Sequence, residues 1–245
     1  MPGSASHPTD PGPLGDAAGA PPRRHPGRPR HTEPSAEYQA RMTEIVETAA
    51  RVFREKGYDA GSLDDVAGAL GLRKGSLYYY VRSKAELLYL VFNRAISRSL
   101  DRLDECEQIE DPRDRLAALI RHQAVSVAEE PSFFSVFFDQ RPRLAATYET
   151  EIRVKERHYL HVFAEAVAAA VKEGTIIPVE PRYGAQALLG MTSWVYKWFE
   201  PGRDDIEQFV QSCVDLLLCG GRATNGRRPR SDSRRRAIGA GARPQ

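Results

Sequence analysis

The sequence contains few cysteines and no long apolar run. Its three cysteines, Cys106, Cys213 and Cys219, are spaced too widely for a zinc site or a disulfide framework. No segment approaches the roughly 18 consecutive apolar residues of a membrane-spanning helix. The first residues also lack the charged start and apolar stretch of a secretory signal. We therefore expect a protein of the reducing cytoplasm with no membrane contact.

The common catalytic signatures are missing as well. The chain contains no Gly-rich phosphate loop before a helix, no His-Glu-x-x-His and no Gly-x-Ser-x-Gly. His122, His158 and His161 could share a metal, but no further ligand stands at a suitable spacing. We expect neither an enzyme nor a protein with a bound metal or cofactor.

Alternation of apolar and polar residues with period two, which marks half-buried strands, does not persist over any length. Apolar residues instead recur every three or four positions, and glycine and proline separate the helical stretches. The expected helices lie at about 36–56, 63–70, 74–81, 84–106, 113–129, 144–173, 181–200 and 204–219. The sequence predicts an all-α protein.

Charge is distributed unevenly along the chain, although the net charge is only +2. Residues 221–245 carry eight arginines and one aspartate. Residues 1–34 are rich in Pro, Gly and Ala and contain four arginines. Such segments cannot bury enough apolar surface to fold, so we expect a disordered arm at 1–34 and a disordered basic tail at 221–245. Basic tails on an acidic body suit a protein that meets nucleic acid through a small part of its surface.

The most informative stretch is residues 61–88, where a short apolar helix, a glycine turn and a basic aromatic helix follow one another. Apolar residues recur at helical spacing from Leu63, and Ser62 with Asp65 forms a pair of the capping-box type. Leu77 is the one clear inward residue of the second helix. This order predicts a helix-turn-helix.

The second helix offers a polar, positively charged surface. Between residues 73 and 84 there are four cations and no carboxylate: Arg73, Lys74, Arg82 and Lys84. Successive residues turn by about 100° around a helix, so Tyr78, Tyr79 and Tyr80 cannot all be buried. Phenols and hydroxyls between cations supply neutral donors to phosphate oxygens. A phosphate-binding surface explains this run better than a solvated basic face does.

These residues resemble the N-terminal DNA-binding domain of the TetR family of repressors. The shared features are the apolar helix, the Gly-Leu/Val turn, the Lys-Gly-Ser/Thr-Leu-Tyr-Tyr helix and Ser-Lys-x-x-Leu. Tyr80-Val81 stands where many relatives carry His-Phe. The resemblance implies a DNA-binding domain at 35–84 and a ligand-binding and dimerisation domain at 85–220.

The resemblance also implies roles for individual residues. Lys74, Gly75 and Ser76 would approach the bases or nearby backbone in the major groove. Ser62, Tyr78, Tyr79, Tyr80 and Lys84 would contact phosphates, and Arg73 belongs to the same surface.

A Gly-Arg-Pro-Arg segment precedes the first helix. Its Arg28 and Arg30 could lie in an A·T-rich minor groove, whose narrowness concentrates negative potential. A basic linker without a specific role is the alternative.

The last two expected helices are apolar around most of their circumference, which requires cover on several sides. A second copy of the chain would provide that cover. We expect a homodimer whose interface includes Leu188, Trp198, Phe209 and Leu217. Two recognition helices about 34 Å apart would then bind a palindromic operator in double-stranded DNA. A core buried within one chain is the alternative.

A dense aromatic segment is typical of a hydrophobic core, and the alternative is the wall of a ligand pocket. With the run at 190–202, the pocket would be lined by Phe133, Phe134, Phe137, Phe138 and Trp194. The run resembles its equivalent in regulators of fatty-acid or sterol degradation that respond to acyl-coenzyme A thioesters. Cations at the mouth of this pocket could bind the phosphates of the thioester: Arg141, Arg143, Arg153, Lys155, Arg157, His158 and His161. The same helix also carries carboxylates, so a salt-bridged outer face is equally compatible with the sequence.

Together these features predict a ligand-responsive transcriptional repressor, released from DNA by a small lipophilic effector such as an acyl-CoA thioester. Two alternatives stay open. One is an architectural, non-specific DNA-binding protein. The other is a repressor of an efflux gene with a neutral lipophilic inducer.

Overall fold

The structure, a computed structural model, describes residues 35–101 and 103–223. The regular elements of these residues are helices, with no β-strand among them, in agreement with the predicted all-α class. They are α1 (Ala36–Ala60), α2 (Leu63–Ala69), α3 (Lys74–Tyr80), α4 (Lys84–Leu100), α5 (Leu103–Glu107), α6 (Pro112–Glu129), α7 (Pro131–Asp139), the 3₁₀ turn η1 (Arg141–Arg143), α8 (Ala146–Lys172), α9 (Pro181–Ser193), α10 (Val195–Trp198) and α11 (Ile206–Ala223).

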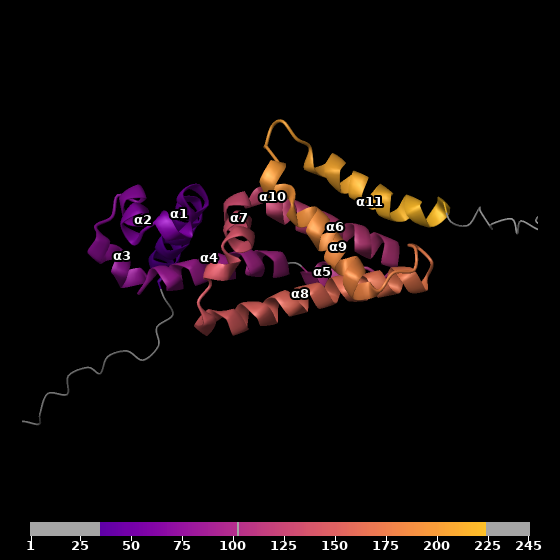
Figure 1. Ribbon diagram of the computed structural model, residues 1–245, viewed down its shortest axis with the longest axis horizontal. Helices are drawn as coiled ribbons and strands as arrows, with labels where there is room; N and C mark the ends of the chain where they lie inside the picture. Colours follow the sequence, from indigo (N-terminus) through magenta and orange to yellow (C-terminus); the bar gives the residue numbers. More distant parts are fainter. Residues whose placement is uncertain (1–34, 102, 224–245) are drawn as a thin grey trace, which may run out of the picture.

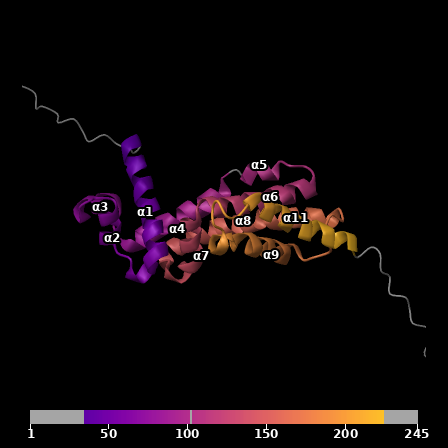
Figure 2. The same cartoon turned by 90° about the horizontal axis from the view of Figure 1, so that it is seen from above.

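The helices form an elongated molecule with a small lobe at one end (Figures 1 and 2). Helices α1, α2 and α3 make up this lobe, and α4 runs from it into the larger body. In the body, α6 packs against α8, α9 and α11. None of the helices described combines the length and the apolar character that crossing a membrane requires.

One continuous hydrophobic core runs through both parts. Its largest fully buried side chains include Phe53 of α1, Phe92 of α4 and Phe163 of α8. Leu77, the predicted inward residue of α3, has no exposed surface. Cys106 and Cys213 are buried, as expected for small apolar side chains.

Side-chain caps fix the start of α2 and α4. The Ser62 hydroxyl accepts from the Asp65 amide at 3.1 Å, and the Asp65 carboxylate accepts from the Ser62 amide at 2.8 Å, which completes the predicted capping box. Ser83 caps α4 by accepting from the amide of Glu86. These caps define the starts of the helices on either side of α3, whose own start has no side-chain cap.

Glycine ends two of the long helices where the sequence predicts it. Gly57 (φ 77°) interrupts α1, and Gly174 (φ 73°) follows α8; both lie in the left-handed region that favours glycine.

Three predicted helix boundaries were wrong. The single helix expected at 181–200 is divided into α9, which ends at Ser193, and the short α10 (Val195–Trp198). The helix expected to run from 84 to about 106 ends at Leu100, where Asp101 turns extended (ψ 132°), and α5 follows as a separate piece. No proline or glycine marks that break. At the C-terminal end, α11 continues to Ala223, past the helix end expected at residue 219.

The Asp65 carboxylate connects the capping box to α1 and should make stability depend on pH. Its hydrogen bond with Lys56, at 2.6 Å, and those with Ser62 lower the pKa of Asp65 from 3.8 to about 2. A lowered pKa in the folded state stabilises the protein above the unfolded value, and this contribution is lost as the pH falls toward the folded value. We expect Asp65→Asn to lower the urea midpoint at pH 7 and the difference from wild type to shrink between pH 4 and pH 2. An equal loss of stability at pH 7 and at pH 2 would mean that the carboxylate charge is not involved.

Candidate functional site

Helix α3 turns most of its side chains away from the protein. Leu77 anchors it, while Lys74, Gly75, Ser76, Tyr78 and Tyr79 are exposed. Tyr79 is 75% exposed and Tyr78 47%, values unusual for large aromatic side chains. The surface therefore combines a cation, a hydroxyl and two phenols that have no role in the core.

Neither backbone conformation nor packing within the described protein requires a glycine at position 75. Its backbone is not in the left-handed region, and a Cβ added there would meet nothing within 4 Å. Glycine inside a helix costs about 1 kcal/mol relative to alanine. A glycine at this place fits a surface that another molecule approaches closely.

Two of the predicted DNA-contacting cations are engaged within the protein. The Lys74 ammonium lies 2.7 Å from the Asp64 carboxylate, an exposed pair whose hydrogen bond raises the pKa of Lys74. The Lys84 ammonium donates to the Asp59 carbonyl at 3.1 Å and lies 4.3 Å from the centre of the Tyr58 ring. Lys84 is thus held at the junction of α1 and α4, whereas Lys74 can exchange its partner at little cost.

Tyr80 differs from its two neighbours because it is half-buried. Its ring lies 5.1 Å from those of Tyr38 and Tyr79. Tyr38 stands in the first turn of α1, outside the apolar stripe of that helix, so sequence periodicity did not reveal its place beside α3.

The structure does not leave Ser62 a free donor for a phosphate. Its hydroxyl hydrogen is directed to the Asp65 carboxylate at 2.6 Å, and its amide donates to the same group. In the DNA-free chain Ser62 therefore serves the capping box, and its phosphate contact stays a prediction. Arg73 is exposed and available, whereas Arg28 and Arg30 lie outside the residues that the structure describes.

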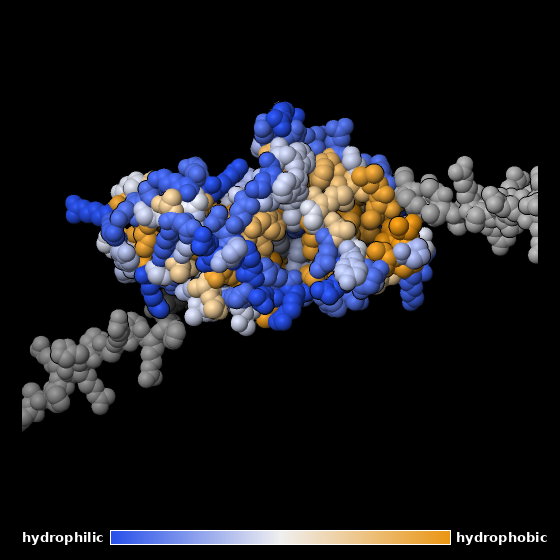
Figure 3. All heavy atoms as spheres, viewed as in Figure 1, coloured by the Kyte–Doolittle hydropathy of each residue, from blue (hydrophilic) through white to orange (hydrophobic). Residues whose placement is uncertain are grey.

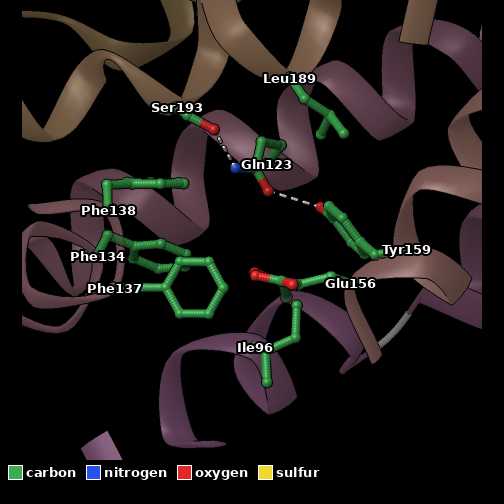
Figure 4. Close-up of a pocket in the computed structure, with 10 residues that line it drawn as sticks. Ile96, Gln123, Phe134, Phe137, Phe138, Glu156, Tyr159, Leu189 and Ser193 are labelled. Carbon is green, nitrogen blue, oxygen red and sulfur yellow. Dashed lines mark hydrogen bonds between the residues drawn. The ribbon is translucent and has the colours of Figure 1, made fainter. Parts of the chain in front are cut away.

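The body contains a cavity of about 200 Å³ between α4, α6, α7, α8 and α9 (Figure 4). Its apolar wall consists of Ile96, Phe134, Phe137, Phe138 and Leu189. Its polar groups belong to Ser99, Gln123, Glu156, Tyr159 and Ser193.

Two of the predicted pocket residues lie elsewhere. Phe133 lines a separate hollow between α1 and α4, because it points to the opposite side of α7. Trp194 is 57% exposed, since it follows Ser193 by one residue and a helix turns by about 100° per step. Phe134, Phe137 and Phe138 are the aromatic residues on this cavity that the sequence predicted.

A chain of hydrogen bonds crosses the cavity wall, from the buried Tyr159 to the half-buried Ser193. The Tyr159 hydroxyl donates to Gln123 Oε1 at 2.7 Å, and Gln123 Nε2 donates to Ser193 Oγ at 3.1 Å (Figure 4). Burial raises the pKa of Tyr159, so its hydroxyl stays a donor. The signal for this network was available, because Gln123 interrupts the apolar stripe of α6 at the position after Leu116, Leu119 and Ile120.

Glu156 brings a carboxylate to the same cavity. Its Oε2 accepts from Arg141 at 2.8 Å, and burial raises the pKa of Glu156 against the opposing effect of that guanidinium. The second terminal nitrogen of Arg141, Nη1, is buried and has no hydrogen-bond partner among the described residues.

Most of the cations expected at the pocket mouth pair with carboxylates of the protein itself. Arg143 binds Asp59 of α1 at 2.6 Å. Along α8, Arg153 binds Glu149 at 2.6 Å and Lys155 binds Glu151 at 3.1 Å. This arrangement corresponds to the salt-bridged alternative rather than to a free phosphate-binding cluster, although Arg157 and His158 remain exposed.

The three histidines considered for a metal do not meet. The His122 ring contacts the Ser99 carbonyl at 2.7 Å, whereas His158 and His161 are exposed on α8. Among the described residues there is no group of three or more His, Cys, Asp or Glu side chains that could hold a metal ion.

Helix α7 connects the cavity with the small lobe. It packs against α1 and α4 as well as lining the cavity. The Phe137 ring lies 5.1 Å from that of Phe92, and Arg54 of α1 donates to Ser132 at 3.3 Å.

Hydrophobic residues gather on the surface over α9 and α11, at the end away from α3 (Figure 3). Along α9, the exposed positions Tyr183, Ala187, Gly190 and Trp194 follow one face at helical spacing. Leu216 of α11 is 74% exposed. Small residues between aromatic ones let another helix approach closely.

The predicted interface residues fit this face only in part. Leu188 is unavailable, because it is 3% exposed and belongs to the core of its own chain. Trp198 and Phe209 pack on each other at 5.1 Å and, like Leu217, are half-buried within the chain. The sequence argument chose the largest apolar residues, which the chain uses for its own core.

Comparison with known proteins matches both parts of the chain to domains of one family. Residues 45–90 match the domain described as bacterial regulatory proteins, tetR family, and residues 110–220 match the tetracyclin repressor-like C-terminal domain. The chain is 26% identical over 190 residues to the HTH-type transcriptional repressor KstR2 of Rhodococcus jostii (strain RHA1), which covers 74% of this chain and 90% of that protein.

Solved structures show the same fold. AibR in complex with isovaleryl coenzyme A and operator DNA matches with a TM-score of 0.66 and 31% identity, over 73% of this chain and 98% of AibR. The TetR-family regulator PfmR from Thermus thermophilus matches with a TM-score of 0.67 and 28% identity, over 72% of this chain and 97% of PfmR.

Proposed function

The chain belongs to the TetR family of bacterial regulatory proteins, and we propose that it is a transcriptional repressor that leaves its operator when an acyl thioester binds. The α3 surface carries this proposal, since its cation, hydroxyl, phenols and unhindered glycine have no internal role. AibR, which shares the fold, has been crystallised on operator DNA. Lys74, Gly75 and Ser76 would face the bases, and Arg73, Tyr78, Tyr79, Tyr80 and Lys84 would contact phosphates.

The repressor would act as a homodimer through the exposed face of α9 and α11. Tyr183, Ala187, Gly190 and Trp194 of α9, with Leu216 of α11, supply the apolar and small residues that a helical interface needs. This face lies at the end away from α3, so two copies joined there would leave both α3 helices free for the half-sites of a palindrome.

The effector would enter the cavity behind α7. A protein cavity of about 150 Å³ admits benzene, so the 200 Å³ here suits a short acyl group or a single ring. AibR binds isovaleryl coenzyme A, which is consistent with an acyl thioester of this size. Arg157 and the unpaired nitrogen of Arg141 are candidates for contacts to the rest of the thioester.

Binding there would act on DNA through α7. Protein interiors are closely packed, so a ligand against Phe134, Phe137 and Phe138 displaces the helix that carries them. Because α7 packs on α1, the displacement reaches the small lobe. The proposal assigns the protein no catalysis and no resident cofactor, and a place in the cytoplasm beside its operator.

Fluorescence anisotropy on the upstream intergenic DNA tests this function. The complex would be titrated with acyl-coenzyme A thioesters and with the corresponding free acids. Release by a thioester but not by its acid supports the proposal. Release by a neutral lipophilic compound alone would favour the efflux-gene alternative. Equal affinity for operator and scrambled duplex, with a steep salt dependence, would favour architectural DNA binding.

Replacing Gly75 should change stability and DNA affinity in opposite directions. We expect Gly75→Ala to raise the free energy of unfolding by about 0.5–1 kcal/mol, because it removes the helix penalty of glycine. The new methyl group would meet DNA, so operator affinity should fall at least tenfold. Gly68→Ala is the matched control: Gly68 is exposed on α2 with equally open space, and its replacement should stabilise without loss of affinity. Unchanged affinity of Gly75→Ala would show that α3 does not enter the groove as proposed.

A charge on the exposed face of α11 should separate the dimer. We expect Leu216→Glu to shift the protein toward monomer in analytical ultracentrifugation and to weaken operator binding, because a buried carboxylate would have no partner. Val154→Glu on α8, also an exposed apolar position, should leave the dimer intact. A Leu216→Glu protein that stays dimeric would place the interface elsewhere.

A further inference from the structure

Two donors on the cavity wall are left without an acceptor. Tyr159 is neutral and donates to Gln123 Oε1, which turns the amide nitrogen of Gln123 toward Ser193. The Ser193 oxygen therefore accepts, and its own hydrogen has no acceptor among the described residues. The second N–H of Gln123 is likewise unused by the described part of the chain. Gln123 is 3% exposed, and Ser193 is half-buried.

An acceptor faces the same space from another side. Oε2 of Glu156 accepts from Arg141, whereas Oε1 receives no hydrogen bond from the residues described. In Figure 4 the Gln123–Ser193 pair and Glu156 lie on opposite sides of the cavity, with the phenylalanine rings at one end. The cavity is thus apolar at its phenylalanine end and lined by hydrogen-bonding groups across its middle.

A purely hydrocarbon ligand fits this wall poorly. It would remove water from a hydroxyl, an amide and a carboxylate without replacing the lost hydrogen bonds, which is costly for each group. A site built to hydrogen-bond a substituent discriminates strongly against the analogue that lacks it. The arrangement favours a ligand with an oxygen atom where these groups converge.

We propose that the group bound in this cavity is an acyl chain or ring carrying a hydroxyl or carbonyl oxygen, to which Ser193 and Gln123 donate hydrogen bonds. This inference rests on the proposed function and specifies its effector as an oxygenated rather than a saturated acyl thioester. A hydroxyl would in addition donate to Glu156, whereas a carbonyl would use the two donors alone. Ser193 and Gln123 are then the residues that determine effector specificity.

Isothermal titration of the DNA-free protein tests this with three thioesters of one carbon skeleton: saturated, hydroxylated and oxo-substituted. We expect an oxygenated thioester to bind about threefold to tenfold more tightly than the saturated one, the gain of one or two hydrogen bonds. Tighter binding of the hydroxyl compound identifies the alcohol as the substituent, and tighter binding of the oxo compound identifies the ketone.

The variant Ser193→Ala removes one of the two donors, so it should lower this preference by about twofold to threefold while binding of the saturated compound changes little. Ser126→Ala is the matched control, because Ser126 is a buried serine of α6 that does not line the cavity. Equal or tighter binding of the saturated thioester by the wild-type protein overturns the inference and leaves the repressor function standing. Binding of none of the three overturns the thioester class itself, and with it this inference. A preference that is unchanged in Ser193→Ala would also overturn it.

Discussion

The packing of α7 between the small lobe and the cavity is the contact on which the rest of the molecule depends. Three of its phenylalanines line the cavity, and the same helix rests on α1 and α4. Immediately after it, Arg143 of η1 binds Asp59 near the end of α1. Lys84, which begins α4, donates to the carbonyl of that same Asp59. The cavity, the interdomain ion pair and the start of α4 are therefore linked by direct contacts within a few residues.

The polar wall of the cavity adds a second constraint. Gln123 and Tyr159 are buried, whereas Ser193 and Glu156 are half-buried, and the hydrogen of Ser193 and Oε1 of Glu156 have no partner within the described part of the chain. Polar groups of this kind are stabilised by a ligand that supplies the missing hydrogen bonds. The cations Arg143, Arg153 and Lys155 differ from these groups, because each already pairs with a carboxylate of the same chain. Two of these pairs, Arg153–Glu149 and Lys155–Glu151, lie within α8, and the third joins η1 to α1.

Local signals in the sequence predicted the parts of the fold that depend on local interactions. The capping box at Ser62, the inward position of Leu77 and the glycine stops at 57 and 174 each follow from a few neighbouring residues, and the structure has all of them. The break after Leu100 carries no such mark and depends on tertiary packing. The directions of Phe133 and Trp194 depend on helix register to within one residue, which periodicity does not resolve. Gln123 was visible as a polar residue in an apolar stripe, but its partners Tyr159 and Ser193 come from distant helices.

The open space over Gly75 has an evolutionary consequence. A side chain introduced there touches nothing in the described protein, so the helix-turn-helix tolerates many residues at this position without repacking. In the proposed repressor, selection on DNA binding would therefore act at this residue independently of selection on the fold. A substitution at Gly75 would alter the contact with DNA while the core and the cavity stay unchanged.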